Sequence, residues 1–336
     1  MSLRIRFANA VKSIANSHRP GLAPDIFLFA TPRGGSTWMM EIIASQPGLK
    51  FYDEPLSPRR ENVAFSGVVP SWEALMPDTG DPARVIAFLK ELQAGRHGYM
   101  NPPPFRRNHR YFTNRVVFKI HEIEHLMVEA QRALGAQVVY LLRHPIATSI
   151  SRDQTPRLEQ LLNCSYHAAV LDNSVRHAEI TALARTGSFF ERKVISWCFE
   201  NLVALRRPQP TWLYVSYEEL VLNPERSCDL LMDRLGLRDR EAMLESFDRP
   251  AANIQLSRDE TLAALRSPDA CRRRHRLVSK WQGKVSDAER GQAAQILGLF
   301  DIDAYDASDV LPAERFLHFS DTRAILQSGS LDAAES

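Results

Sequence analysis

The hydrophobic pattern alternates between short apolar runs and longer stretches with helical spacing. The apolar runs predict strands at residues 26–30, 48–52, 115–120, 137–142 and 211–216. Between them, helices are expected near 83–93, 123–134, 193–205 and 224–235, with further helices resuming at 38 and beginning at 145. Uninterrupted apolar runs are typical of buried strands in parallel sheets. Because helix-length segments separate the strands, we expect a three-layer α/β fold with a central parallel sheet flanked by helices.

A turn of small and polar residues follows the first predicted strand. Between the strand and the helix lie Arg33, Gly34, Gly35, Ser36 and Thr37. Glycines let a backbone approach a phosphate closely, and a helix N-terminus favours a bound anion. The turn is therefore P-loop-like, although the Walker pattern ending in Gly-Lys-[Ser/Thr] is absent and a standard ATP or GTP site is not expected. A glycine-rich turn that binds no phosphate is the alternative interpretation.

Charged and polar residues also lie at or just beyond the ends of the other predicted strands. In open parallel sheets, ligands bind beyond the carboxyl ends of the strands. Each residue alone has a simpler interpretation as a solvated charge or a core side chain. The prediction of a ligand site therefore depends on their occurrence together at the ends of successive strands. The residues are Asp53, Glu54, Lys119, His121, Arg143, Ser149, Ser151, Tyr217 and Glu218.

Composition favours an ordinary globular protein. The chain has 336 residues, 44% of them hydrophobic and 24% charged, and a net charge of +2. This balance does not suggest the concentrated basic face of a nucleic-acid-binding protein, so no nucleic-acid partner is expected. Four scattered cysteines fit a reducing compartment, and no apolar run has transmembrane length. We therefore expect one cytoplasmic domain over residues 1–336.

Three sequence blocks resemble the sulfotransferases that use 3′-phosphoadenosine 5′-phosphosulfate (PAPS). Residues 31–38, Thr-Pro-Arg-Gly-Gly-Ser-Thr-Trp, are similar to the 5′-phosphosulfate loop of that family. Residues 139–151 resemble its 3′-phosphate segment, in which an Arg and a Ser eight positions later hold the phosphate. Residues 213–224 are similar to the segment near the adenine. The resemblance spans residues 25–305 and implies a sulfotransferase that uses PAPS without a metal.

The resemblance also implies roles for individual residues. Arg33 and the backbone of residues 34–37 would hold the phosphosulfate, and Trp38 would stack on the adenine. Arg143 and Ser151 have the spacing of the 3′-phosphate pair, and Tyr217 lies in the adenine segment. Residues 272–276 resemble the basic loop that closes over the 3′-phosphate, with Arg274 and Arg276 as candidates for that contact.

Two residues compete for the role of general base. His121 follows Lys119 in a Lys-x-His pattern similar to the cytosolic branch, and it precedes Arg143 by the 22 residues which that branch shows. Glu54 matches the base of the branches that carry an arginine in the phosphosulfate loop. The sequence combines features of both branches, and we favour His121 while Glu54 stays open.

Three other functions are compatible with single features of the chain. His121-Glu-Ile-Glu-His125 satisfies the zinc-hydrolase pattern His-Glu-x-x-His, which requires both histidines on one helix. A nucleotide kinase with a degenerate loop would also use arginine clusters, and would depend on Mg²⁺. A non-catalytic nucleotide-binding module is the third alternative. The two base candidates favour an enzyme over this last interpretation.

The acceptor is not encoded in any recognisable motif. Variable segments at residues 56–114 and 153–190 are expected to form its pocket, and residues 312–336 a C-terminal tail. Their aromatic and arginine content suits the hydroxyl or amine of a small molecule, such as an alcohol, phenol, sugar or lipid head group. A carbohydrate or peptide tyrosine is the alternative acceptor. The oligomeric state is open, and a homodimer is compatible with the sequence.

Overall fold

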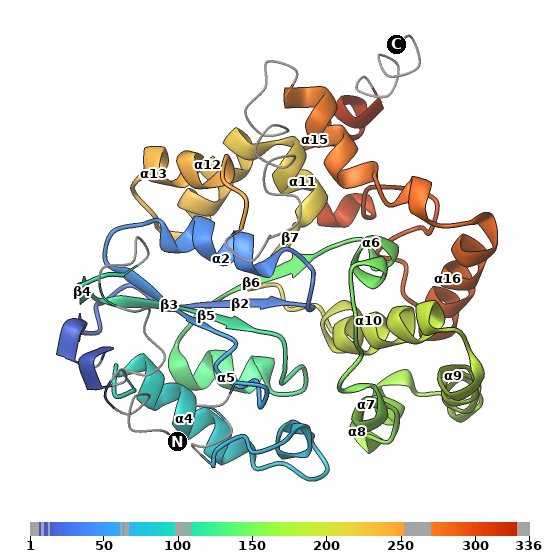
Figure 1. Ribbon diagram of the computed structural model, residues 1–336, viewed down its shortest axis with the longest axis horizontal. Coiled ribbons are helices and arrows are strands. Elements are labelled where there is room, and N and C mark those ends of the chain that lie inside the picture. Colours follow the sequence, from blue (N-terminus) through green and yellow to red (C-terminus); the bar gives the residue numbers. More distant parts are fainter. Residues whose placement is uncertain are drawn as a thin grey trace.

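A five-stranded parallel sheet forms the centre of the computed structural model, which describes residues 7, 10–12, 14–60, 63, 67–97, 104, 109–251 and 270–327. In sheet order the strands are β3 (Leu49–Asp53), β5 (Arg115–Ile120), β2 (Ile26–Ala30), β6 (Gln137–Leu142) and β7 (Leu213–Ser216) (Figure 1). All five coincide with predicted strands to within two residues. The expected parallel α/β sheet is therefore confirmed.

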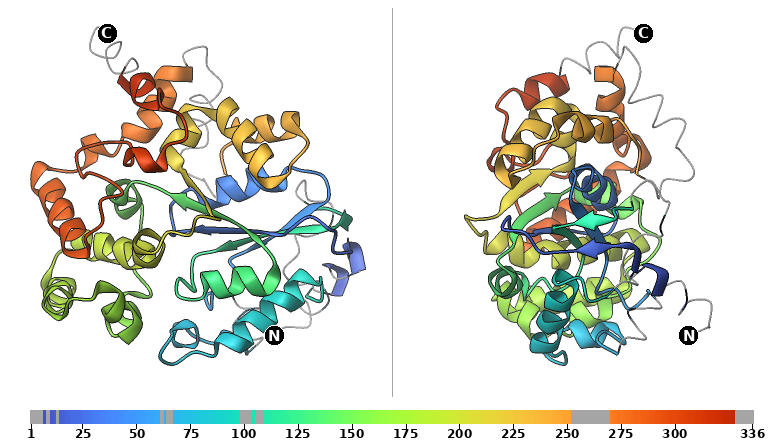
Figure 2. Two further views of the ribbon diagram at one scale, coloured as in Figure 1. Left: turned by 180° about the vertical axis from the view of Figure 1, so that it is seen from behind. Right: turned by 90° about the vertical axis from the view of Figure 1, so that its left-hand side faces the viewer.

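Helices cover both faces of the sheet, as Figures 1 and 2 show. One face carries α2 (Ser36–Ala44), α11 (Tyr217–Leu222), α12 (Pro224–Leu235) and α13 (Arg240–Phe247). The other face carries α4 (Pro82–Gln93), α5 (Met127–Leu134) and α10 (Phe189–Arg206). Around α10 lie α6 (Pro145–Ile150), α7 (Leu158–Leu162), α8 (Ser165–Leu171), α9 (Ser174–Thr186) and α16 (Asp287–Phe300). This group lies at the end of the sheet where the strands terminate.

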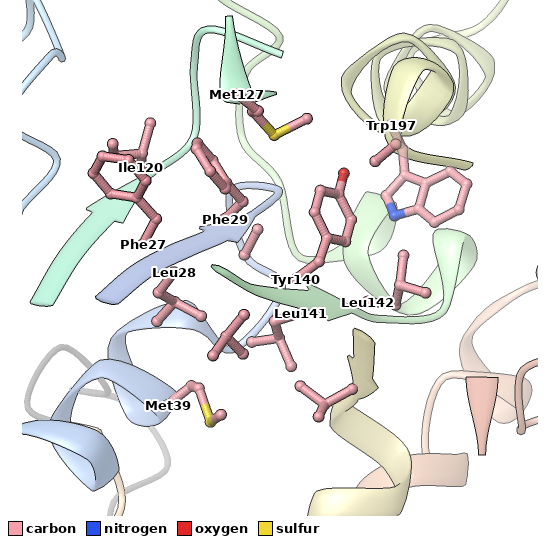
Figure 3. Close-up of a cluster of buried hydrophobic side chains, with 14 of the residues drawn as sticks. Phe27, Leu28, Phe29, Met39, Ile120, Met127, Tyr140, Leu141, Leu142 and Trp197 are labelled. Atoms are coloured by element: carbon pink, nitrogen blue, oxygen red, sulfur yellow. The ribbon is translucent and has the colours of Figure 1, made fainter. Parts of the chain in front are cut away.

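The core follows the alternation of side chains along each strand. Phe27 and Phe29 point toward the α5 face, whereas Leu28 points toward Met39 of α2 (Figure 3). Burying such a side chain contributes about 1.5–3 kcal/mol. Tyr140 of β6 also connects the sheet to α10, because its hydroxyl donates to Asn201 Oδ1 of that helix at 3.0 Å.

Three local predictions differ from the structure. Helix α5 begins at Met127 rather than near residue 123, because Ile123 has a left-handed φ of 60° that a helix cannot contain. Residues 272–276 were expected to form a loop but belong to helix α15 (Ala270–Ser279), which packs against α11. Two-residue strands β1 (Ser17–His18) and β4 (Phe112–Thr113) pair in parallel, and they are too short to give a periodic signal.

The chain also contains short 3₁₀ helices at Trp72–Leu75, Gln282–Lys284 and Glu314–Phe316. Residues 312–327, assigned to a tail from the sequence, are bound to helix α11 through Glu219. Its carboxylate accepts the backbone N–H groups of His318 and Phe319 at 2.9 and 3.0 Å. No helix in the described part of the chain combines the length and apolar character needed to cross a bilayer.

His144 joins the end of β6 to the C-terminal third of the chain. Its ring stacks on Trp281 with 4.1 Å between centroids, and its side chain is fully buried. Nδ1 accepts from the N–H of Ile146 at 3.2 Å, so Nε2 carries the proton and donates to the Asp306 carbonyl at 3.2 Å. Burial lowers the pKa of His144 to about 4, although the Asp306 carbonyl and Asp309 oppose the shift.

The neutral form of His144 predicts a loss of stability in acid. Above pH 6.5 the imidazole is neutral in both states, whereas between pH 6.5 and 4 only the unfolded chain binds the proton. This single group should lower the free energy of unfolding by about 2 kcal/mol at pH 5. The free energy of unfolding, measured in urea, should therefore differ less between pH 7 and pH 5 for His144→Asn than for the parent protein. The amide oxygen of the asparagine can still accept the N–H of Ile146. Equal differences in the two proteins would contradict the assignment.

Candidate active site

The turn between β2 and α2 adopts the backbone conformation of an anion-binding loop. Arg33 and Gly35 both have left-handed backbones, with φ of 68° and 91°. At Gly34 a Cβ atom would lie 2.9 Å from the Thr31 carbonyl oxygen. Helix α2 then starts at Ser36 without a side-chain cap, so the positive end of its dipole faces the turn.

Two predicted anchoring groups lie in direct contact with each other. Arg33 Nε donates to the Ser151 carbonyl at 2.8 Å, and Arg143 Nη1 donates to the Arg33 carbonyl at 3.0 Å. The guanidinium of Arg143 also lies 4.1 Å from the ring centroid of Tyr217. The structure thus brings the loop at 33–37 together with the Arg143 and Ser151 pair at one edge of the sheet.

A second arginine holds the loop and was not anticipated from the sequence. Arg152 is buried, and its Nε donates to the Pro32 carbonyl at 3.2 Å. Its two terminal nitrogens bind the carboxylate of Glu200 on α10 at 2.6 and 3.2 Å. Because the partners are 48 residues apart, no local spacing signals the pair. Two successive loop carbonyls, those of Pro32 and Arg33, are therefore each bound by an arginine.

Lys119 lies at the centre of the acidic side of the site. Its Nζ is 2.5 Å from Asp53 Oδ1 and 3.0 Å from Glu54 Oε1, and it donates to Thr37 Oγ1 at 3.0 Å. The side chain is only 2% exposed, so these contacts act with little solvent screening. Lys119 therefore connects the ends of β3 and β5 to the first turn of α2.

The two candidate bases contact each other. His121 Nδ1 donates to the Ala30 carbonyl at 2.6 Å, which leaves Nε2 facing Glu54 Oε1 at 3.3 Å and Ser36 Oγ at 3.4 Å. Burial alone would raise the pKa of Glu54. The contact with His121 and the charges of Lys119 and Arg60 outweigh burial and hold that pKa well below its usual range. Glu54 is therefore ionised beside the imidazole.

Trp38 lies beside the loop but is largely enclosed. Its ring meets Tyr217 edge-on at 5.7 Å and Phe247 of α13 edge-on at 5.5 Å. Its exposed fraction is 8%. An aromatic wall of three residues thus flanks the start of α2, next to the guanidinium of Arg143.

The two predicted arginines of residues 272–276 are less closely connected to the site. Arg274 is 3.4 Å from Asp248, and Arg276 is exposed on α15. Within the described residues, no hydrogen bond or ion pair links either side chain to Arg143, Ser151 or the loop. Their helix nevertheless packs against α11, which begins with Tyr217.

The His-Glu-x-x-His pattern lacks the helix that a zinc site of this type requires. Residues 121–125 form a turn between β5 and α5, and Nδ1 of His121 is bonded to Ala30. Among the residues that the structure describes, no group of three His, Cys, Asp or Glu side chains is arranged to hold a metal. The two histidines are therefore not presented on successive helical turns.

Comparison with known proteins identifies the family. The model of a family described as the sulfotransferase family matches residues 24–241, more than half of the chain. The chain belongs to the sulfotransferase family. The membership that the sequence blocks suggested is therefore confirmed. No curated protein matches this sulfotransferase at a significant level.

Two solved structures of sulfotransferases are similar to this one at low sequence identity. The sulfotransferase domain from the curacin biosynthetic pathway has a TM-score of 0.42 and 16% identity, covering 85% of this chain and 99% of that chain. Mouse sulfotransferase SULT7A1 complexed with PAP has a TM-score of 0.39 and 15% identity, covering 97% of this chain and 94% of that chain.

The geometry of Gly35 predicts that a methyl group there is not tolerated. A Cβ atom would lie 2.6 Å from Cδ2 of Tyr217, and the φ of 91° disfavours any L side chain. Gly35→Ala should lower the free energy of unfolding by about 1–2 kcal/mol. Gly291→Ala in α16, where a Cβ meets nothing within 4 Å, should instead be neutral or slightly stabilising. Chemical denaturation of both variants tests this, and equal stabilities would contradict it.

Proposed function

We propose that this sulfotransferase transfers the sulfuryl group of PAPS to a hydroxyl or amine of a small-molecule acceptor. The observation that carries the proposal is the contact of Arg33 with Ser151 and of Arg143 with the Arg33 carbonyl. These contacts bring two anion-binding groups within the reach of one nucleotide that is anionic at both ends. When bound, this nucleotide supplies the sulfuryl group.

The described residues fit such a nucleotide. Nε of Arg143 is buried and has no hydrogen-bond partner among the described residues, so a donor is left for an anion. Ser151 and Arg143 would hold the 3′-phosphate. Arg33 and the N–H groups at the start of α2 would hold the 5′-phosphosulfate. Trp38 and Tyr217 would offer their aromatic surfaces to the adenine, and Arg274 or Arg276 of α15 would complete the 3′-phosphate site.

Charge stabilisation is assigned to Arg33, and Lys119 is given a positioning role. An arginine stays protonated at neutral pH, so Arg33 would stabilise the charge that develops on the leaving phosphate without donating a proton. Removing one such preorganised donor typically raises the barrier by about 3 kcal/mol. Lys119 is already neutralised by Asp53 and Glu54, and its contact with Thr37 would fix the start of α2.

Proton removal is assigned to Nε2 of His121, with Glu54 in support. As the acceptor oxygen or nitrogen bonds to sulfur, the bond from sulfur to the 5′-phosphate oxygen would break and leave its electron pair on the phosphate. The acceptor's proton would pass to Nε2, which the Ala30 hydrogen bond leaves as the basic atom. The ionised carboxylate of Glu54, 3.3 Å away, would stabilise the imidazolium that forms. The arrangement differs from that of a catalytic triad, in which the acid binds the ring nitrogen opposite the one that takes the proton, whereas Glu54 faces the proton-accepting nitrogen itself.

The acceptor side is formed by the segments that follow β3 and α6. Arg59 lies 5.9 Å from the Trp72 ring centroid and donates to Gln154, so the two segments meet. Aromatic and cationic side chains together suit a small alcohol, phenol, sugar or lipid head group. A carbohydrate or a peptide tyrosine is the alternative acceptor. Residues Tyr99 and Phe105, also expected near the acceptor, lie outside the described residues.

Ligand-dependent thermal stability tests the nucleotide class. Adenosine 3′,5′-bisphosphate should raise the melting temperature in the presence of a chelator, whereas ATP with Mg²⁺ should not, because binding energy adds to native-state stability. Arg143→Ala should weaken this binding about 10- to 100-fold by calorimetry, since a charged hydrogen bond is lost. Arg315→Ala, which removes an exposed arginine paired with Asp303, is the matched control. Preferential stabilisation by ATP with Mg²⁺ would favour a kinase instead.

Kinetics of two conservative variants would separate the base from its support. His121→Asn should lower kcat by about 10² to 10⁴, with nucleotide affinity nearly unchanged. Glu54→Gln should cost less, because it removes only the carboxylate that would stabilise the imidazolium and leaves the base itself in place. Formation of adenosine 3′,5′-bisphosphate at saturating acceptor provides the rate. A larger loss in Glu54→Gln than in His121→Asn would make Glu54 the base.

A further inference from the structure

Large exposed apolar side chains are concentrated at one end of the molecule. Among the described residues eight such side chains are exposed, and six of them lie in residues 7–22 and 111–112. The N–H of Ser17 donates to the Tyr111 carbonyl at 2.7 Å, so the two segments are neighbours. We name this set the N-terminal patch. Its members are Phe7, Val11, Ile14, Leu22, Tyr111 and Phe112.

The helical spacing of the first three members places them on one face. Residues 7, 10–12 and 14–15 are helical, and positions 7, 11 and 14 are separated by four and three residues. Ile14 is 86% exposed, and Phe112 on β4 is 79% exposed. A monomeric protein in water seldom leaves this many large apolar side chains together at its surface.

The chain around the patch is basic and free of acids. Residues 1–24 contain four Lys or Arg and no Asp or Glu, and no acid occurs between Glu91 and Glu122. Over the whole chain the numbers of basic and acidic residues are almost equal, at 42 and 40. Arg19 is exposed and lies on the β1–β4 pair, because its N–H donates to the Thr113 carbonyl at 2.9 Å.

The patch lies away from the candidate active site. The N–H of Asn114, just after β4, donates to the Gly48 carbonyl at 2.9 Å, at the amino ends of β3 and β5. The candidate site lies at the carboxyl ends of the same strands. In Figure 1, β4 is at the left of the sheet, while α6 and α10 lie beyond the opposite end. The patch therefore does not belong to the acceptor or nucleotide site.

We propose that the N-terminal patch docks on an anionic lipid bilayer. Exposed Phe, Ile and Leu side chains insert at the boundary between head groups and acyl chains, and adjacent cations attract acidic lipids. A second copy of the chain fits less well. A twofold contact would set these acid-free segments against themselves and bring like charges together. Docking leaves the carboxyl edge of the sheet open to water, and it is independent of the transfer reaction proposed above.

Vesicle sedimentation with the full chain tests the proposal. Vesicles of phosphatidylcholine with about 30% phosphatidylglycerol should sediment the protein, and pure phosphatidylcholine should not. Ile14→Ser and Phe112→Ser should each weaken binding roughly tenfold, because each removes one apolar side chain that inserts into the bilayer in the proposed bound state. Arg19→Gln should weaken it roughly fivefold. Val175→Ser and Phe189→Ser remove the two other large exposed apolar side chains among the described residues, and these variants should bind as the parent does.

Several outcomes would overturn the proposal. The protein could fail to bind the acidic vesicles, or it could bind both vesicle types equally. The patch variants and the control variants could also lose vesicle binding to the same extent. A dimer in light scattering that Ile14→Ser and Phe112→Ser dissociate, without vesicle binding, would assign the patch to a second copy. Unchanged melting temperatures would verify that these surface variants are folded. Since adenosine 3′,5′-bisphosphate binding is measured separately, failure here would leave the proposed reaction untouched.

Discussion

The backbone of one short turn is the constraint on which the candidate site depends. Residues 31–35 reverse the chain between β2 and α2, and two of them have left-handed backbones, including the non-glycine Arg33. Such a conformation persists only when its surroundings fix it. Here two arginines bind successive carbonyls, Arg152 that of Pro32 and Arg143 that of Arg33. With its carbonyls bound in this way, the turn can direct N–H groups toward an anion.

Buried ion pairs hold this arrangement to the helices beyond the sheet. Arg152 is paired with Glu200 of α10, and Arg157 is paired with Glu124 while donating to the His121 carbonyl at 2.9 Å. Removing one partner of a buried pair leaves an uncompensated charge and costs about 3–5 kcal/mol. Both the turn at residues 31–35 and the imidazole of His121 are therefore held by arginines that are themselves paired with buried carboxylates. Arg152 and Arg157 act by holding other groups in position.

Sequence reasoning predicted the sheet well because each strand is an apolar run bounded by Pro, Gly or charged residues. It also predicted that Arg33, Lys119, His121 and Arg143 lie at the ends of these strands, since parallel strands end at one edge. It missed Arg152 with Glu200, whose partners are joined only by tertiary packing, and the turn at Ile123, whose backbone conformation overrides helical spacing. Glu54 and His121 were expected at the same edge, but their direct contact at 3.3 Å depends on strand register, which the sequence pattern does not specify.

The strand order gives the molecule two functional flanks. β3 and β5, with the carboxylates, Lys119 and His121, lie on one side of β2, while β6 and β7, with Arg143 and Tyr217, lie on the other. Under the proposed function, the long segment after β3 would join the flank that takes the acceptor proton, and β6 and β7 would hold the nucleotide. Insertions or substitutions in that segment would then change which molecules are accepted without disturbing the nucleotide flank. A chain built in this way would diversify its chemistry on one side while keeping a constant donor on the other.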